Sequence, residues 1–236
     1  MRQSGFDISL SRIMSAENGD GVDSGIQSSL EVLYRAADSK SEDPDSVVAS
    51  ILNLEKLMRE KNKIDPELKD ATLEALAGAG TEKRNWRLVF TTGTVDTQKK
   101  TGQVNYFPIK AIQSFCKEAG GGVDTGTIEN GIYLGRWPVV KFAGDFDWTS
   151  PSASVAKLTF DFSSITLFGS WTIPLKVGEA AAMGAKSGLG SRGNVELEKR
   201  GKRPFFNWIS ADERIATARG GGGGLALWRL EIENDT

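Results

Sequence analysis

Five consecutive glycines near the C-terminus, residues 220–224, constrain the fold more than any other feature of this sequence. Glycine loses more conformational freedom on folding than other residues, so a folded protein keeps such a run only where side chains do not fit or the backbone turns sharply. A phosphate-binding glycine loop needs a strand before it and a helix after it. Here the run is followed by residues 225–230, Leu-Ala-Leu-Trp-Arg-Leu, which are typical of a strand. We therefore predict a glycine hinge between two strands of a closed or strongly bent sheet, and no nucleotide loop.

The absence of histidine and the single cysteine limit the chemistry that the chain can perform. Its 236 residues carry a net charge of -2, contain no histidine and contain one cysteine, Cys116. Without histidine, Ser-His-Asp and Cys-His catalysis within the chain are excluded, and the commonest metal ligand is missing. One cysteine forms neither an intrachain disulfide nor a zinc cluster. We expect a binding protein that is not an enzyme, with no metal, no cofactor and no nucleic-acid partner. The sequence also holds no apolar run of about 18 residues, as a transmembrane helix would need.

Helical periodicity fills residues 22–80, whereas residues 1–21 are expected to form a flexible N-terminus. Asp43-Pro44 and Asp65-Pro66-Glu67 are typical helix starts, and Gly78 with Gly80 is a typical stop. We interpret residues 22–80 as a helical cap packed on the main domain; the alternative is a module that binds a partner. The apolar stripes comprise Ile26, Leu30, Leu33, Tyr34 and Ala37, then Val47, Ile51, Leu54 and Met58, then Leu68, Ala71, Ala75 and Leu76.

From Asn85 onward the apolar period changes to two, which indicates strands with one apolar and one polar face. About eight strands separated by Gly, Pro, Asn and Ser turns favour a sandwich or a barrel over residues 84–233. A parallel sheet is disfavoured because no helices are evident after residue 120. The predicted strands begin at Trp86, Ile132, Val140, Leu158, Ile165, Phe205, Arg214 and Leu225.

Two segments of this half differ from the strand pattern. In residues 107–117, Ile109, Ile112 and Phe115 lie three apart, which predicts a short helix across one end of a barrel. Residues 175–203 form a long Gly/Ala-rich insertion between strands, and long loops are usually functional or mobile. The insertion ends in a basic cluster, which is either a solvated surface or a contact with anionic lipid head groups or a partner. The basic cluster comprises Lys199, Arg200, Lys202 and Arg203.

Three stretches resemble the plastid lipid-associated proteins, also called fibrillins. Residues 85–93, N-W-R-L-V-F-T-T-G, resemble the opening strand W-x-L-x-Y-T-T-S, and residues 112–115, I-Q-S-F, are similar to the short F-Q-x-I-D segment. Residues 208–220 resemble Y-L-D-x-D-L-R-I-S-R-G, with Asp212 on the second aspartate, Arg214 on R-I and Arg219 on R-G. The resemblance covers about residues 22–232. Two residues are inserted between the R-I and R-G pairs, as in a divergent member.

The resemblance implies a mainly β fold, a lipocalin-like antiparallel β-barrel with an N-terminal helical segment. It also implies a location in the plastid (chloroplast), peripheral to the thylakoid membrane or to plastoglobules. Members bind or sequester hydrophobic molecules such as a carotenoid, a prenylquinone or an acyl lipid, and share no catalytic reaction. The alternative is a structural or assembly factor with a filled barrel, docked on a thylakoid membrane protein complex of photosynthesis. A carboxylate-based enzyme on an open barrel is a third reading, although no carboxylate pair stands out.

A barrel of about eight strands has an interior that side chains fill or that holds one small ligand. The aromatic residues proposed for its inward face either line such a site or merely fill a core. Arg214 or Arg219 could stack on Trp86 as a structural latch, and Asp212 could pair with one of these arginines. The candidate ligand-binding residues are Phe90, Tyr133, Phe142, Phe146, Trp148, Phe160 and Phe162.

Overall fold

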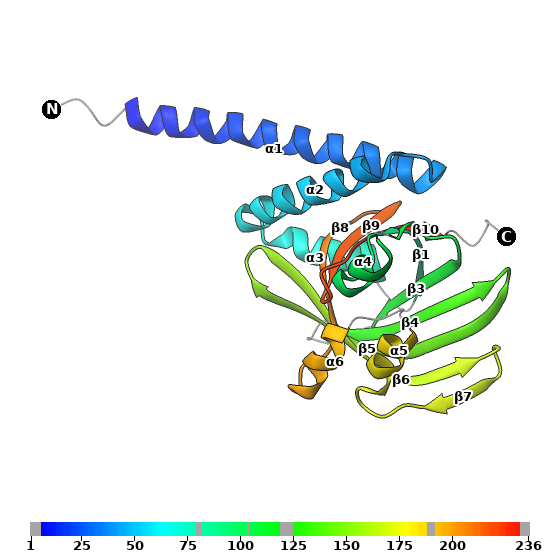
Figure 1. Cartoon of the computed structure of the whole chain (residues 1–236). Coiled ribbons are helices and arrows are strands. Elements are labelled where there is room, and N and C mark those ends of the chain that lie inside the picture. The colour runs from blue at the N-terminus through cyan, green and yellow to red at the C-terminus, as the bar shows by residue number, and fades with distance from the viewer. Residues whose placement is uncertain (1–5, 79–81, 103, 119–124, 188–191, 232–236) are drawn as a thin grey trace.

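The computed structural model describes residues 6–78, 82–102, 104–118, 125–187 and 192–231. Helices α1 (Phe6–Ser39), α2 (Pro44–Ile64) and α3 (Glu67–Ala77) come first and lie on one side of a curved sheet (Figure 1). Shorter helices α4 (Val95–Thr101), α5 (Glu179–Ser187) and α6 (Arg192–Lys199) lie between strands. The strands are β1 (Arg84–Thr91), β2 (Asn105–Tyr106), β3 (Lys110–Lys117), β4 (Thr125–Leu134), β5 (Trp137–Ser152), β6 (Val155–Leu167), β7 (Trp171–Pro174), β8 (Phe205–Ala211), β9 (Ile215–Gly220) and β10 (Leu225–Glu231).

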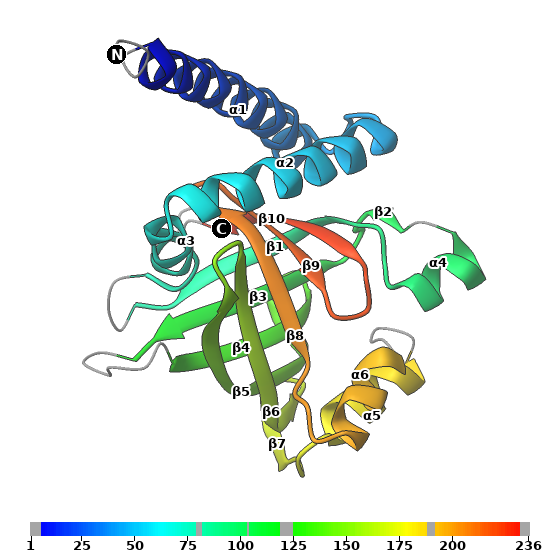
Figure 2. The ribbon, with the colours of Figure 1, turned by 90° about the vertical axis from the view of Figure 1, so that its left-hand side faces the viewer.

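The sheet curves into a ring because its last strand pairs with its first. The order is β10-β9-β8-β6-β5-β4-β3-β1-β2, and β10 also pairs with β1 from Asn85 opposite Glu231 to Thr91 opposite Ala226. The ring is seen in Figure 2, where β8 passes in front of β3 and β4. Each strand pairing in the described residues is antiparallel. The predicted mainly β, antiparallel fold with an N-terminal helical segment is therefore confirmed.

The glycine run forms the turn between β9 and β10, as the sequence predicted. Gly223 has φ +81°, a left-handed conformation that side chains disfavour. A Cβ on Gly224 would lie 2.3 Å from the carbonyl oxygen of Gly93, in the segment after β1. By contrast, a Cβ on Gly220 would have its nearest neighbours at 3.8 Å. Only part of the run is therefore required by geometry, where the turn closes against the segment between β1 and α4.

Two apolar clusters pack on opposite faces of the ring. The inner cluster fills the inside of the sheet and includes residues of α3, so that α3 closes one end of the ring (Figure 2). The outer cluster joins α1 and α2 to the outer face of β1, β8, β9 and β10. The inner cluster comprises Leu73, Leu76, Ala77, Trp86, Phe115, Ile128, Phe146, Trp148, Ala156, Leu158, Phe160, Trp208, Ala216, Ala218 and Trp228. The outer cluster comprises Leu33, Ala36, Ala37, Val47, Ile51, Leu54, Val89, Phe90, Ile209, Ile215, Leu225 and Leu227.

The predicted stripes of α1 and α2 are confirmed, because their residues lie in the outer cluster or pack against it. Helix α2 begins as expected: the Asp43 side chain accepts a hydrogen bond from the Ser46 amide. The predicted face of α3 is partly wrong. Ala71 is exposed, and Leu73 takes its place beside Leu76 in the inner cluster. The reason is that α3 packs across the end of the ring, where tertiary contacts select its buried face.

Three segments differ from the sequence-based expectations. Residues 110–117, part of the predicted short helix, are strand β3, because the apolar spacing of three came from residues on both faces of a strand. Helices α5 and α6 occupy the insertion at 175–203, where no helix was expected, and residues 188–191 lie outside the described residues. Helix α1 begins at Phe6, so most of the expected flexible N-terminus is helical. No proline interrupts residues 6–39, and a helical glycine costs only about 1 kcal/mol.

The close approach of Gly224 to Gly93 can be tested by mutation, with Gly220 as the control. We expect Gly224→Ala to lower the free energy of unfolding by about 3 kcal/mol, because its methyl group must displace the Gly93 carbonyl. Gly220→Ala should change stability by less than about 1 kcal/mol, since its Cβ has room. Urea unfolding followed by tryptophan fluorescence measures both. Equal stability of the two variants would contradict the close approach of the two segments.

Candidate functional site

One end of the inner face is tightly filled with aromatic rings. The Phe115 ring packs edge-to-face on Phe146, with ring centroids 5.9 Å apart, and on Trp208 at 5.6 Å. Trp208 in turn contacts Trp228 at 5.2 Å. These four side chains are buried, and three residues of α3 belong to the same cluster. Contacts of this kind stabilise a core beyond simple area burial, so this end of the ring acts as a plug.

The aromatic side chains further along the inner face are less covered. Phe162 and Phe206 pack against the inner cluster and are only partly buried, as is Leu88 of β1. Phe142 is also partly buried, and its ring contacts that of Phe162 at 5.6 Å. Phe160 joins the two regions by stacking on Phe206 at 5.2 Å. The inner face therefore changes from a filled end to a half that leaves apolar aromatic surface accessible.

Two amide side chains interrupt this apolar inner face. Gln113 on β3 lies opposite Trp86 of β1 and opposite Asn130 of β4, and Asn130 lies opposite Phe142 of β5. Directly paired residues share a face, so the four side chains form one row around the inside of the ring. Gln113 is only 5% exposed. The Gln113 Oε1 and Asn130 Oδ1 atoms are both buried and accept no hydrogen bond from any described residue.

Such unpaired oxygens are costly, because a buried acceptor without a partner destabilises a fold by about 1–3 kcal/mol. A donor on a ligand, or a water, would relieve this cost at Gln113 and Asn130. Sequence reasoning missed both residues as site residues. Gln113 stood in the segment predicted to be a helix, and Asn130 lay outside the predicted strands. The sequence does place one polar residue at an inward position of each of two neighbouring strands. The two positions can be recognised as a pair only when the register of β3 and β4 is known.

Five of the candidate ligand residues lie on the inner face. Phe146 and Trp148 belong to the filled end, and Phe160 lies between the two regions. Phe142 and Phe162 lie in the accessible half. The structure thus brings these residues together on the inward side of β5 and β6, the arrangement that their alternation predicted.

The other two candidates lie elsewhere. Phe90 belongs to the outer cluster and packs on Tyr106 at 5.3 Å, because the β1–β10 register shifts between Leu88 and Phe90 and turns the ring outward. The inward assignment of Phe90 is therefore wrong. Tyr133 packs against Gly131, whose Cβ position is 2.6 Å from the tyrosine ring. Burial, with the nearby charges of Glu129 and Glu231, raises the pKa of Tyr133.

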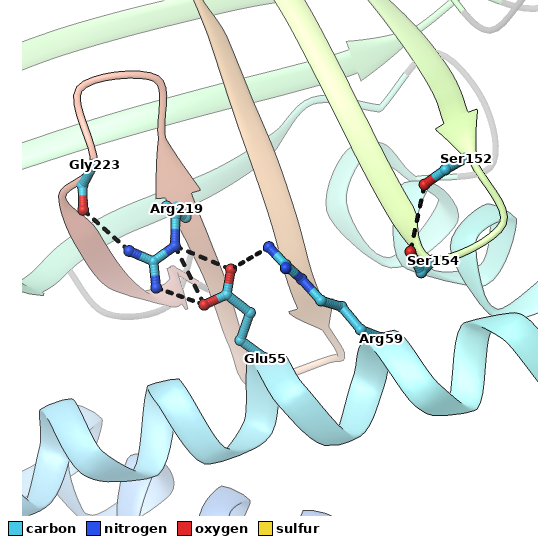
Figure 3. Close-up of polar contacts among 6 residues, drawn as sticks. All are labelled: Glu55, Arg59, Ser152, Ser154, Arg219 and Gly223. Atoms are coloured by element: carbon cyan, nitrogen blue, oxygen red, sulfur yellow. Dashed lines mark hydrogen bonds and ion pairs between the residues drawn. The ribbon is translucent and has the colours of Figure 1, made fainter.

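Arg219 joins the ring to helix α2 rather than stacking on Trp86. Its guanidinium donates to both carboxylate oxygens of Glu55, with Nε 3.0 Å from Oε1, and also donates to the Gly223 carbonyl (Figure 3). Arg59 of the same helix donates to Glu55 at 2.8 Å. Burial alone would raise the pKa of Glu55, but the hydrogen bond and charge of Arg219 outweigh it, and the pKa is lowered. This carboxylate is held ionised on the outer face, between α2 and the glycine turn.

The remaining latch candidates have partners other than those expected. The Arg214 guanidinium stacks over the Tyr34 ring at 4.1 Å, not over Trp86. Asp212 accepts hydrogen bonds from the Arg214 and Ile215 amides and from the Tyr34 hydroxyl at 2.7 Å. Burial and Asp212 together raise the pKa of Tyr34 to about 12. Trp86 is fully buried, and its indole donates to the Leu76 carbonyl at 2.8 Å, which ties α3 to β1.

The basic cluster at 199–203 is only partly available for a partner. Arg203 is tied to β5 by an ion pair with Asp147 and by a hydrogen bond to the Asp145 carbonyl. Lys199 pairs with Glu196 on α6, while Arg200 and Lys202 are exposed. Arg203 thus anchors the end of the insertion to the sheet.

A small cleft lies between α2, the β5–β6 hairpin and β8. It encloses about 10 Å³, which is room for roughly one water. Asn62 lines it, and its buried Oδ1 has no partner among the described residues. The cleft therefore suits a structural water rather than an organic ligand. Its lining residues are Glu55, Met58, Arg59, Asn62, Ser154, Val155, Asn207, Trp208 and Ile209.

Metal ligands do not gather anywhere in the described residues: no group of three or more cysteine or acidic side chains could hold an ion. Within the same residues, no helix combines the length and the apolar character needed to cross a membrane.

No family model, no curated protein and no solved structure matches the chain.

The ion pair between α2 and β9 should make stability depend on pH. A carboxylate with a lowered pKa contributes stability above its unfolded pKa of about 4.3, and this contribution is lost as pH falls through the folded pKa. We expect Glu55→Gln to lose about 1–3 kcal/mol at neutral pH and to show a shallower loss of stability below about pH 4.5. Urea unfolding from pH 3 to 7, about the range over which carboxylates titrate, measures both effects.

Glu60→Gln provides the matched control, because Glu60 is an exposed glutamate on the same helix. It should follow the wild-type pH profile. If Glu55→Gln also follows that profile, the Arg219 ion pair does not hold α2 on the ring.

Proposed function

We propose that this protein binds a hydrophobic small molecule on the accessible half of its inner face, without catalysing a reaction. The observation that carries the proposal is the contrast along the ring between a filled aromatic end and a half with partly exposed aromatic side chains. The closure of β10 on β1 supports a lipocalin-like β-barrel as the description of this ring. Barrels of about eight strands are either filled by side chains or hold one small ligand, and ligands bind at the mouths of such barrels.

The ligand would enter from the end opposite α3. Its apolar part would contact Phe142, Phe162 and Phe206, which already present aromatic surface. Burying apolar area contributes about 25 cal/mol per Å², so contact of an isoprenoid or acyl segment with these rings would favour binding. The aromatic plug around Phe115 would limit how deep the ligand reaches.

The resemblance to plastid lipid-associated proteins supports the choice of ligand class and cellular setting. Its opening motif lies in β1 and its closing motif lies in β8 and β9, next to β10, the partner of β1. On this basis we propose a divergent member of that family in the plastid, at thylakoids or plastoglobules. The proposed ligands are a carotenoid, a prenylquinone or an acyl lipid.

The filled end of the ring favours a second candidate, a structural or assembly factor for a thylakoid protein complex. If the aromatic packing around Phe142 and Phe162 closes in solution as it does around Phe115, no ligand would fit. The protein surface would then carry the function. Ligand binding separates the two candidates.

Isothermal titration of the ligand-free protein with a xanthophyll, a short-chain plastoquinone and a fatty acid tests the proposal. We expect at least one to bind with a one-to-one stoichiometry. Phe142→Trp and Phe162→Trp should each weaken this binding about tenfold, because the larger ring occupies the accessible half. Phe205→Trp is the control, since Phe205 lies on the outer side of β8 against Lys157. Absence of binding by all three ligands would favour the structural role.

The amide row predicts how the ligand is oriented. Gln113→Leu should weaken binding of a hydroxylated carotenoid about tenfold, the equivalent of one hydrogen bond, and leave a pure hydrocarbon carotene unaffected. Because the change removes an unpaired buried oxygen, the free energy of unfolding of the ligand-free protein should stay equal or rise. A drop in stability without any change in ligand preference would show that Gln113 serves the fold alone.

A further inference from the structure

Two neighbouring hairpin turns expose large apolar side chains to solvent. In the β4–β5 turn, Leu134 is 79% exposed and Trp137 is 72% exposed. In the β6–β7 hairpin, Phe168 is 60% exposed, Trp171 is 70% exposed and Ile173 is 49% exposed. We call these five residues the hairpin-tip patch. In Figure 1 both hairpins reach the right-hand side of the molecule, away from α3 and the β5–β6 turn.

The two turns lie side by side. Val140 of β5 pairs with Leu167 of β6, and the Phe168 amide donates to the Val139 carbonyl at 3.0 Å. The turns themselves also touch, because a Cβ on Gly169 would lie 3.2 Å from the Pro138 ring. The two halves of the patch are therefore carried by adjoining turns.

Among the described side chains, the aromatic residues that are exposed, rather than buried or half-buried, are the three of this patch, Trp137, Phe168 and Trp171. Single exposed apolar residues are normal, but contiguous exposed apolar patches mark a site of interaction. None of the five residues belongs to the inner or the outer cluster. Neither cluster therefore explains why Trp137 and Trp171 stand at the tips of turns.

The two segments that carry the patch contain basic but no acidic residues, and the next carboxylate along the chain, Glu179, accepts a hydrogen bond from the Lys176 amide. No acidic residue occurs in residues 133–144 or in residues 162–178, although acidic residues outnumber basic ones in the chain as a whole. Arg136 stands in the β4–β5 turn and Lys176 follows β7, and both are exposed. Apolar side chains flanked by basic ones suit an interface with anionic lipid, where each cation near the surface adds about 1 kcal/mol.

We propose that the hairpin-tip patch inserts into the head-group region of a lipid surface. Tryptophan is enriched at the depth where head groups meet acyl chains, and here one tryptophan belongs to each hairpin. The turns are tight and project outward: Gly135 has φ +62° with open space around it, and Gly169 has φ +70°. Two narrow tips can insert between lipid head groups, whereas a protein partner would need two pockets of complementary shape.

One alternative is a second copy of the chain at this patch, and the other is a membrane contact through the basic cluster. A second copy of the chain could pair with the outer edge of β7, which among the described strands pairs with β6 alone. That edge is four residues long and ends in Pro174, both of which discourage strand addition. The basic cluster could make the membrane contact instead, but Arg203 is tied to Asp147 and Lys199 to Glu196.

The inference rests on the proposed function only for the choice of natural membrane. Contact with lipid needs no bound carotenoid, quinone or acyl chain, so the test uses ligand-free protein. If the protein binds vesicles but none of the ligands, lipid contact through the hairpin-tip patch is supported and the proposed ligand-binding function is contradicted. If it binds a ligand but no vesicles, the ligand-binding function is supported and lipid contact through the patch is contradicted.

The experiment is co-flotation of the full chain with phosphatidylcholine vesicles that contain a minor fraction of phosphatidylglycerol. We expect wild-type protein to float with the vesicles and its tryptophan emission to shift to the blue. The double variant Trp137→Ser/Trp171→Ser should lower the partition coefficient about 100-fold, about tenfold for each buried side chain. Because both residues are exposed, the variant should unfold at the wild-type urea concentration.

Two control variants separate this surface from others. Ile64→Ser removes an equally exposed apolar side chain at the end of α2, where the residue is 85% exposed, and should float like wild type. The triple change Lys199→Ser/Arg200→Ser/Lys202→Ser should lower binding only slightly. Loss of binding in the triple variant and not in the tryptophan variant would overturn the proposal. So would a wild-type dimer that the tryptophan changes dissociate, or a wild-type protein that fails to float.

Discussion

The pairing of β10 with β1 is the contact on which the rest of this structure depends. It closes the sheet into a ring. A closed sheet has no free edge, but it has an inner face, an outer face and two ends, whose apolar residues must be covered by other side chains. The hairpin that leads into β10 is possible because Gly223 takes a left-handed backbone and Gly224 passes against the Gly93 carbonyl. One end of the ring is closed by α3, and the indole of Trp86 on the closing strand donates to the last turn of that helix.

The outer face of the same strands is held by helices through a different mixture of forces. Apolar residues of α1 and α2 supply the bulk of the contact, and polar groups fix its position. Glu55 joins two arginines beside the glycine turn, while Asp212 and Arg214 hold Tyr34 at the β8–β9 turn. Both sets of contacts lie at the ends of β9. The N-terminal helices therefore brace the strands that close the ring, and an arginine that sequence reasoning assigned to Trp86 is used for this purpose.

Much of the architecture could be predicted from local pattern, and the errors have identifiable causes. The glycine turn, the stripes of α1 and α2, and the inward face of β5 and β6 follow from backbone freedom and from periods of 3.6 and two. Phe90 could not be placed, because a one-residue register shift in β1 reverses its face and leaves no mark in the sequence. β3 resembled a helix because both of its faces carry apolar side chains. Gln113 and Asn130 become a pair only through strand register, which is a long-range property.

The two ends of the ring differ in a way that connects its interior to its surface. At the α3 end the aromatic rings pack on one another, and the β5–β6 turn there is held by the hydrogen bond from Lys69 to the Ser152 carbonyl. At the other end, aromatic rings inside the sheet are partly uncovered, and the β4–β5 and β6–β7 turns carry exposed tryptophan, phenylalanine and leucine. Strands β5 and β6 run through both regions, so an apolar molecule leaving a lipid surface at the hairpin tips would meet apolar residues of the same two strands on the inner face. Apolar side chains that are incompletely buried lower the stability of the fold. At this end of the ring, contact with a hydrophobic ligand or a membrane would cover them.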